Sequence, residues 1–247
     1  SQPMGFYLPA QIVRDAMNHE VEIRPVCINA SRWDCTLEPS DGRYMAVRLG
    51  LRMVRELSNA DAAAIVLARG EAPYTSVEEI QRRANVGRGA LDRIGAAGGF
   101  GDIAVSRRQG LWDVKGLGNE ALPLFVAADE REGLIRREAV EPASSLAEMP
   151  EGQEVVEDYR TMGLSLRAHP LAFLREDLER QRFRPCSDLI TAKDGKWINI
   201  AGLVLLRQKP GSAKGVMFIT LEDETGIANL VIWPSLFEKF RRVVLGS

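Results

Sequence analysis

The spacing of apolar positions changes along this chain and divides it into segments of different structure. Near the N-terminus, apolar residues recur at helical spacing over Gln11–Met17, which predicts a short helix. Val21–Ile28 alternates enough to predict a strand. Trp33–Leu37 and Tyr44–Leu49 flank a turn-forming Pro-Ser-Asp-Gly stretch, so together they predict a hairpin. The first part of the chain is therefore expected to be a small mixed α/β unit.

The middle of the chain has the period of helices, and glycines interrupt it repeatedly. This pattern predicts several short helices between residues 50 and 115. The stretch that follows is rich in proline and acidic residues, which predicts a connector dominated by loops. Within it, Leu171–Gln181 has helical spacing, and Pro185 stops the helix soon afterwards.

Beyond Lys196 the pattern becomes that of strands. Three runs, Trp197–Arg207, Gly215–Leu221 and Ile227–Ile232, are separated by turn-forming residues, and Ser235–Arg242 has helical spacing. Three consecutive antiparallel strands followed by a helix are the opening of an OB-fold barrel. A fourth strand is expected to begin near Val243–Leu245, so the sequence predicts an incomplete, truncated barrel.

The sequence thus predicts an α+β multidomain chain. We expect four segments: an α/β unit at 1–45, a tandem helix-hairpin-helix region at 46–115, an acidic connector with helices at 116–190, and an OB-fold domain at 191–247.

One hairpin in the helical region has the features of a phosphate-binding helix-hairpin-helix. Ser76 and Glu79 form a capping-box pattern that starts the first helix. Val86, Gly87, Arg88 and Gly89 then form the hairpin, and Arg93 follows on the second helix. Glycines leave backbone N–H groups uncovered at a helix N-terminus, where an anion is favoured. Such a hairpin grips the DNA backbone without reading sequence. The competing interpretation is a plain corner between two helices, with glycine as the cap.

A second copy of this pattern lies about 30 residues earlier, over Arg55–Val66. Its helical spacing is intact, but Glu56 and Ser58 stand where glycines are expected. A carboxylate there would repel phosphate, so we expect this copy to act as a packing partner.

The predicted strand module carries residues suited to single-stranded nucleic acid. OB-folds bind single strands with a basic groove and stacking aromatic rings. Arg207, Lys209 and Lys214 supply charge on the first hairpin loop, and Phe218 is a candidate stacking platform. Trp197 and Trp233 are expected to pack as core or rim residues, because tryptophans near strand ends usually do.

Overall charge says little about partners, but its distribution does. The formal net charge of −2 conceals a basic segment at 43–110, an acidic one at 129–160 and a basic one at 196–214. This division indicates modules with different neighbours, although solvated surface charge alone would also explain it. Three cysteines without C-x-x-C spacing and only two histidines argue against a zinc site or a disulfide framework. We expect a cytoplasmic protein without a membrane span.

Five strings of residues, taken together, resemble one family. They are Pro3–Tyr7, Arg24–Asn29, Trp33–Glu38, Gly163–Leu171 and Phe218–Gly226. Their order is similar to that in bacterial C-family DNA polymerases, relatives of the DNA polymerase III alpha subunit. The Trp-Asp-Cys-Thr-Leu-Glu and Leu-Glu-Asp-Glu-Thr-Gly strings resemble the error-prone, DnaE-type branch that is induced by DNA damage.

The resemblance implies a C-terminal fragment that runs from the end of the fingers domain into the OB domain. The metal-binding aspartates of the palm, which use Mg²⁺, would lie upstream. No catalytic residue, metal site or cofactor is therefore expected in this segment, and the chain alone should not polymerise. In the family, the hairpins hold duplex product and the OB domain lies near single-stranded template, so DNA is the expected partner. His169, next to Pro170, is expected to cap a turn.

A different class of function is also open, that of a protein-interaction module. In alpha subunits a peptide that binds the sliding clamp lies where this chain has Leu122, Leu124 and Phe125. Ala121 replaces the glutamine expected there, which favours a weakened or lost site. Accessory proteins of the damage response or the clamp itself are the alternative partners.

Overall fold

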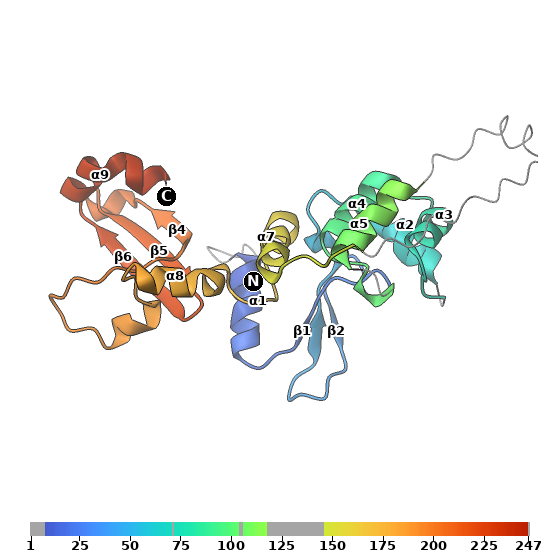
Figure 1. The fold of residues 1–247 in the computed structure, drawn as a ribbon, viewed down its shortest axis with the longest axis horizontal. Helices are drawn as coiled ribbons and strands as arrows, with labels where there is room; N and C mark the ends of the chain where they lie inside the picture. Colours follow the sequence, from blue (N-terminus) through green and yellow to red (C-terminus); the bar gives the residue numbers. More distant parts are fainter. Residues whose placement is uncertain (1–7, 71, 104–105, 118–145, 247) are drawn as a thin grey trace, which may run out of the picture. The chain divides into compact units, whose positions relative to one another are not determined.

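The structure is a computed structural model that describes residues 8–70, 72–103, 106–117 and 146–246 (Figure 1). The chain divides into two compact units, one up to Leu166 and one from Arg167 onward. Each unit has a core of its own.

The first unit begins with a helix and a small sheet. Helix α1 spans Pro9–Asn18, and the strands are β1 (Ile23–Arg24), β2 (Thr36–Glu38) and β3 (Ala46–Arg48). Strand β3 lies between the others, parallel to β1 and antiparallel to β2. The predicted hairpin is confirmed. The strand predicted over Val21–Ile28 is only two residues long, because Pro25 has no N–H to continue the ladder.

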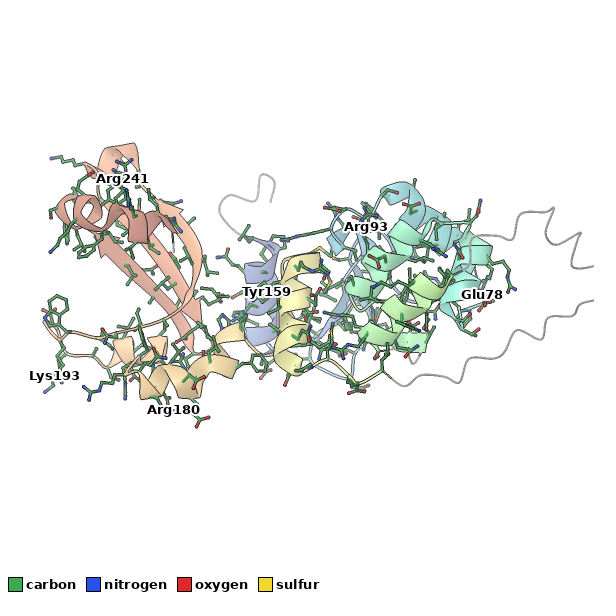
Figure 2. The ribbon with its side chains drawn as sticks, turned by 45° about the horizontal axis from the view of Figure 1, so that its top comes forward. Glu78, Arg93, Tyr159, Arg180, Lys193 and Arg241 are labelled. Atoms are coloured by element: carbon green, nitrogen blue, oxygen red, sulfur yellow. The ribbon has the colours of Figure 1, made fainter. Side chains whose placement is uncertain are left out.

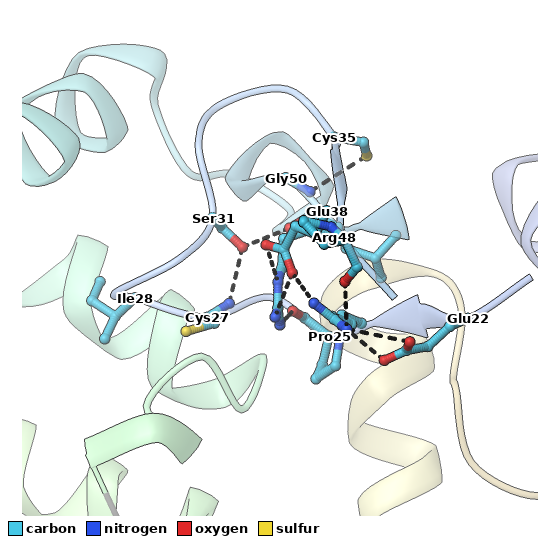
Figure 3. Close-up of polar contacts among 12 residues, drawn as sticks. Glu22, Pro25, Cys27, Ile28, Ser31, Cys35, Glu38, Arg48 and Gly50 are labelled. Carbon is cyan, nitrogen blue, oxygen red and sulfur yellow. Dashed lines mark hydrogen bonds and ion pairs between the residues drawn. The ribbon is translucent and has the colours of Figure 1, made fainter. Parts of the chain in front are cut away.

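An ion-pair network ties these three strands together (Figure 3). The Glu38 carboxylate accepts hydrogen bonds from Arg48 Nε and Nη2, both at 3.0 Å, and from Arg24 Nη1 at 2.7 Å. Arg24 also pairs with Glu22 at 2.7 Å, and Arg48 donates to the Pro25 carbonyl at 3.0 Å. These donors favour the ionised carboxylate and lower the pKa of Glu38 to about 2.

Short helices form the remaining elements in the described part of the first unit, as the spacing of glycines predicts. They are η1 (Leu51–Met53), α2 (Asn59–Arg69), α3 (Val77–Ala84), α4 (Arg88–Ala96), η2 (Gly101–Ile103), α5 (Arg107–Gly116) and α7 (Glu151–Met162). Fully buried side chains of the sheet region and of the helices share one core, among them Ile28, Leu49, Ile65, Ile80, Leu91 and Leu164. The segments expected at 1–45 and 46–115 therefore pack around a common core.

Helix α7 is joined to α5 by a buried ion pair. Arg107 donates to the Asp158 carboxylate and, at 3.0 Å, to the Glu154 carbonyl. Ser165 Oγ donates to the other Asp158 oxygen at 2.7 Å. Both partners of the Arg107–Asp158 pair are at least nine-tenths buried, so breaking it would leave an uncompensated charge in the interior.

The second unit contains the predicted antiparallel sheet. It begins with η3 (Pro170–Leu174), α8 (Arg175–Arg180) and η4 (Cys186–Ile190), and continues with β4 (Leu203–Gln208), η5 (Gly211–Ala213), β5 (Met217–Asp223), β6 (Gly226–Ile232) and α9 (Pro234–Gly246). The strand order is β4-β5-β6, antiparallel throughout. His169 caps η3 as predicted, because its Nδ1 accepts a hydrogen bond from Leu171 N.

Helix α9 covers one face of this sheet. Met217 and Ile219 of β5 are buried against Phe237, whereas Phe218 and Val231 are paired on the opposite, exposed face. The expectation of a fourth strand near Val243 is wrong, since these residues continue α9 after a kink at Phe240. The described residues of the second unit form one three-stranded sheet and no closed barrel. No helix among the described residues is long and apolar enough to cross a bilayer.

The Glu38 network generates a prediction about pH. Because the pKa of Glu38 is depressed, its contribution to stability is present above its ordinary pKa of 4.5 and is lost as the pH falls toward 2. Glu38→Gln should lower the free energy of unfolding by about 1 kcal/mol at pH 6, and by much less at pH 3. Urea unfolding at both pH values measures this. The control is Asp41→Asn, an exposed carboxylate in the same turn; an equal effect of the two variants at pH 6 would contradict the prediction.

Candidate nucleic-acid interface

The two predicted hairpins have the same backbone geometry. In each, a non-glycine residue adopts a left-handed conformation, Glu56 with φ 60° and Asn85 with φ 49°. A buried apolar residue follows, then an extended capping residue, and then the first residue of a helix. Positions 56–59 thus correspond to positions 85–88, so the structure places the repeat at an offset of 29 residues.

The second hairpin leaves its helix N-terminus open. Gly87 caps α4 without a side-chain hydrogen bond, and the first turn of α4 contains no acid. A Cβ at Gly87 would meet no atom within 4 Å, and its φ of −70° suits any residue. This glycine is therefore not required by the fold, and what it provides is access to the backbone N–H groups of Arg88 and Gly89, which have no intrahelical acceptor. Gly87, Arg88 and Gly89 are all exposed, whereas Val86 is buried in the core.

In the first hairpin, side chains of the chain itself occupy the N-terminus of helix α2. Ser58 Oγ accepts a hydrogen bond from Asp61 N at 3.0 Å and donates to the Asp61 carboxylate at 2.7 Å. Asp61 also puts a negative charge in the first turn of α2. The helix N-terminus already has its cap and its anion, which agrees with the role of packing partner expected from the sequence.

Arg93 connects the two hairpins. Its Nη2 lies 3.5 Å from Glu56 Oε2, and its Nη1 lies 3.2 Å from the position that a Cβ at Gly89 would take. The guanidinium therefore lies beside the first turn of α4, close to the carboxylate of the first hairpin. Both side chains are well exposed, at 41% and 80%, so the pair is a weak surface interaction that an anion could displace.

A shallow cavity of about 310 Å³ extends this surface from α4 to α5. It is lined by Arg88, Gly89, Asp92, Val114 and Lys115. The sequence pattern does not indicate Lys115, because only the packing of α4 on α5 brings it near the hairpin. Gly95 permits that packing: a Cβ there would lie 2.9 Å from the Phe100 ring and 3.6 Å from Leu111.

The capping box at the start of α3 differs in detail from the prediction. Ser76 Oγ accepts from Glu79 N at 3.1 Å, as expected. The Glu79 carboxylate, however, accepts from the N–H and hydroxyl of Thr75, both at 2.8 Å, instead of from Ser76. Arg83 adds an ion pair at 3.0 Å, and these contacts lower the pKa of Glu79 to about 2.

The residues singled out in the strand module do not form one surface. Arg207 lies opposite Ile219 in the ladder and donates to the Leu245 carbonyl of α9 at 2.8 Å. The Lys209 ammonium lies 4.4 Å from the centre of the Phe237 ring, also on α9. Phe218, by contrast, is 41% exposed on the other face. Lys214 is exposed at the end of the connecting loop, in a left-handed conformation.

Two tryptophans contradict the expectation that they pack. Trp197 is fully exposed, at 102%, and Trp233 is 63% exposed. The sequence pattern placed Trp197 inside a strand, whereas the first described strand of the sheet begins only at Leu203. The clamp-like residues Leu122, Leu124 and Phe125 lie outside the described residues.

Two protein families match parts of the chain. Residues 20–110 match the helix-hairpin-helix motif, and residues 198–247 match the OB-fold nucleic acid binding domain. The first match contains both hairpins, and the second contains the sheet and α9.

Curated relatives match the chain along its whole length. It is 57% identical to "Error-prone DNA polymerase 2" of Rhizobium meliloti (strain 1021), and 57% identical to the protein of that name in Agrobacterium fabrum (strain C58 / ATCC 33970). "Error-prone DNA polymerase" of Brucella abortus biovar 1 (strain 9-941) is 45% identical. Each alignment covers all of this chain but only 23%, 23% and 22% of the relative. The chain therefore spans about a quarter of the length of these relatives.

Proposed function

Because this chain belongs to the error-prone DNA polymerases and spans about a quarter of their length, we propose that it is the part that holds DNA during damage-tolerant synthesis. The second hairpin grips the duplex backbone of the primer–template, and the OB-fold domain contacts single-stranded template. Nucleotidyl transfer, its palm aspartates and its Mg²⁺ belong to the remainder of the parent enzyme. The cytoplasm is the proposed compartment.

The observation that carries this proposal is the open N-terminus of α4. Exposed N–H groups, no acid in the first turn, and the cations Arg88 and Arg93 next to it make a site for a phosphate. Phosphate contacts fix position and carry no sequence information. A polymerase needs this kind of contact, since it must hold whatever sequence it has just copied.

The substitution Gly87→Asp should lower the affinity for DNA without lowering the stability of the fold. Aspartate is a good helix cap and a favourable charge at a helix N-terminus, and a Cβ has room there. We therefore expect unchanged or higher thermal stability, together with an affinity for primer–template DNA at least about tenfold lower, because the carboxylate repels the phosphate. Fluorescence anisotropy at low salt and thermal melting measure the two effects. Arg88→Glu should also weaken binding.

The matched control is Gly101→Asp, which adds the same charge at another open glycine of the same unit. Equal affinities of the Gly87→Asp and Gly101→Asp variants would show that the hairpin is not the phosphate site. If the unmodified chain binds no DNA at low salt, the DNA-binding proposal fails for this segment.

The Glu56–Arg93 pair generates a prediction that a substitution makes DNA binding tighter. The Glu56 carboxylate competes with phosphate for Arg93, so Glu56→Gln should tighten binding about two- to fivefold at low salt, the range expected for a surface pair. In an Arg93→Gln background the same substitution should have no effect. Glu78→Gln is the control, since Glu78 lies on α3 away from Arg93 (Figure 2). Equal tightening in both backgrounds would show that Glu56 acts as a general repulsive charge instead.

Docking of a clamp or of accessory proteins stays a prediction. If Leu122, Leu124 and Phe125 engage a sliding clamp, Phe125→Ala should abolish capture of the chain by an immobilised clamp and leave DNA affinity unchanged. Capture that does not depend on Phe125 would show that this peptide is not the clamp-binding site.

A further inference from the structure

A loop in the second unit presents an exposed tryptophan together with two lysines. Residues 191–197 are all exposed, and they include Lys193, Lys196 and Trp197 (Figure 2 labels Lys193). The loop lies between η4 and β4, and it precedes the OB-fold match, which begins at residue 198. We call residues 191–197 the basic loop.

The basic loop has a defined conformation. Lys196 N donates to the Lys193 carbonyl at 3.2 Å, and Gly195 has φ 78°, which is the arrangement of a tight turn with glycine in the left-handed position. The Asp194 carboxylate accepts a hydrogen bond from the Gly195 N–H at 2.9 Å. A hydrogen bond of 2.8 Å from Arg184 N to the Asn199 carbonyl closes the longer segment that contains η4 and the basic loop. The turn thus holds the two lysines at its ends and Trp197 directly after it.

Trp197 contributes nothing visible to the folding of its unit. Its exposure of 102% means that no described residue covers the ring. Tryptophan is normally among the most buried residues on average, and its large apolar surface yields binding energy only when a partner covers it. The exposed ring of Trp197 therefore indicates a surface that binds a partner.

We propose that the basic loop binds single-stranded DNA, with a base stacked on Trp197 and the adjoining phosphates held by Lys193 and Lys196. Aromatic rings interleaved with cations are the means by which proteins hold single strands. A duplex does not fit equally well, because its bases are stacked on one another and do not offer a free face. The proposal rests on the proposed function, and it names a place where template would be held just before the OB-fold sheet.

The test compares variants of the whole chain for binding to a fluorescently labelled oligothymidylate of 15 nucleotides. Trp197→Ala should weaken binding about tenfold, within the range measured for stacking on one base, and Trp197→Phe should retain most of the affinity. Replacing Lys193 and Lys196 with glutamine should reduce the slope of log affinity against log salt by about 1.4, or about 0.7 for each phosphate that is no longer neutralised. The thermal stability of Trp197→Ala should be unchanged, because the ring is exposed.

A crossed measurement separates this site from the hairpin. Trp197→Ala should leave binding to a blunt duplex unchanged, whereas Gly87→Asp should weaken duplex binding and leave binding to the oligothymidylate unchanged. Quenching of tryptophan emission by the oligothymidylate should be largely abolished in Trp197→Phe. Unchanged oligothymidylate affinity in Trp197→Ala, together with unchanged quenching in Trp197→Phe, would overturn the proposal and indicate that a protein surface covers the ring.

Discussion

The arrangement of the proposed DNA site depends on one backbone constraint, a left-handed residue followed by a buried apolar side chain. Leu57 and Val86 anchor the two hairpins in the same core, and the left-handed conformations of Glu56 and Asn85 turn the chain so that a helix starts directly above each anchor. Such a conformation costs about 1 kcal/mol or more in a non-glycine residue. Burial of the apolar residue offsets that cost, so the exposed helix N-terminus is held in place by packing beneath it.

The same backbone supports two opposite electrostatic roles. At the first hairpin a serine and an aspartate satisfy the helix N-terminus from within the chain. At the second hairpin glycines leave it open, and the arginine of that helix is balanced by the glutamate of the first. In the proposed site the carboxylate would limit the attraction for anions, and weak, reversible contact would suit a surface along which DNA moves. The duplicated motif thus supplies both the proposed site and the charge that would moderate it.

Features determined by local sequence were predicted well, and features determined by packing were not. The hairpin at Val86–Gly89, the cap at His169 and the three strands of the sheet follow from short-range patterns, so the sequence was sufficient. The neighbours of Lys115 and Arg207 depend on how α5 and α9 pack, which no short pattern specifies. The face on which the Arg207 side chain lies depends on strand register. A shift of one residue would move the side chain from the face covered by α9 to the open face. The exposure of Trp197 was missed because its run of apolar residues resembled a strand.

The buried Arg107–Asp158 pair has a consequence for the order in which the first unit folds. Its partners are 51 residues apart, whereas the two hairpins are built from neighbours in the chain. Local contacts form sooner than contacts that close a long loop, so α7 is expected to dock onto hairpins that are already assembled. Once docked, the pair holds α7 against α5 from within the interior of the unit.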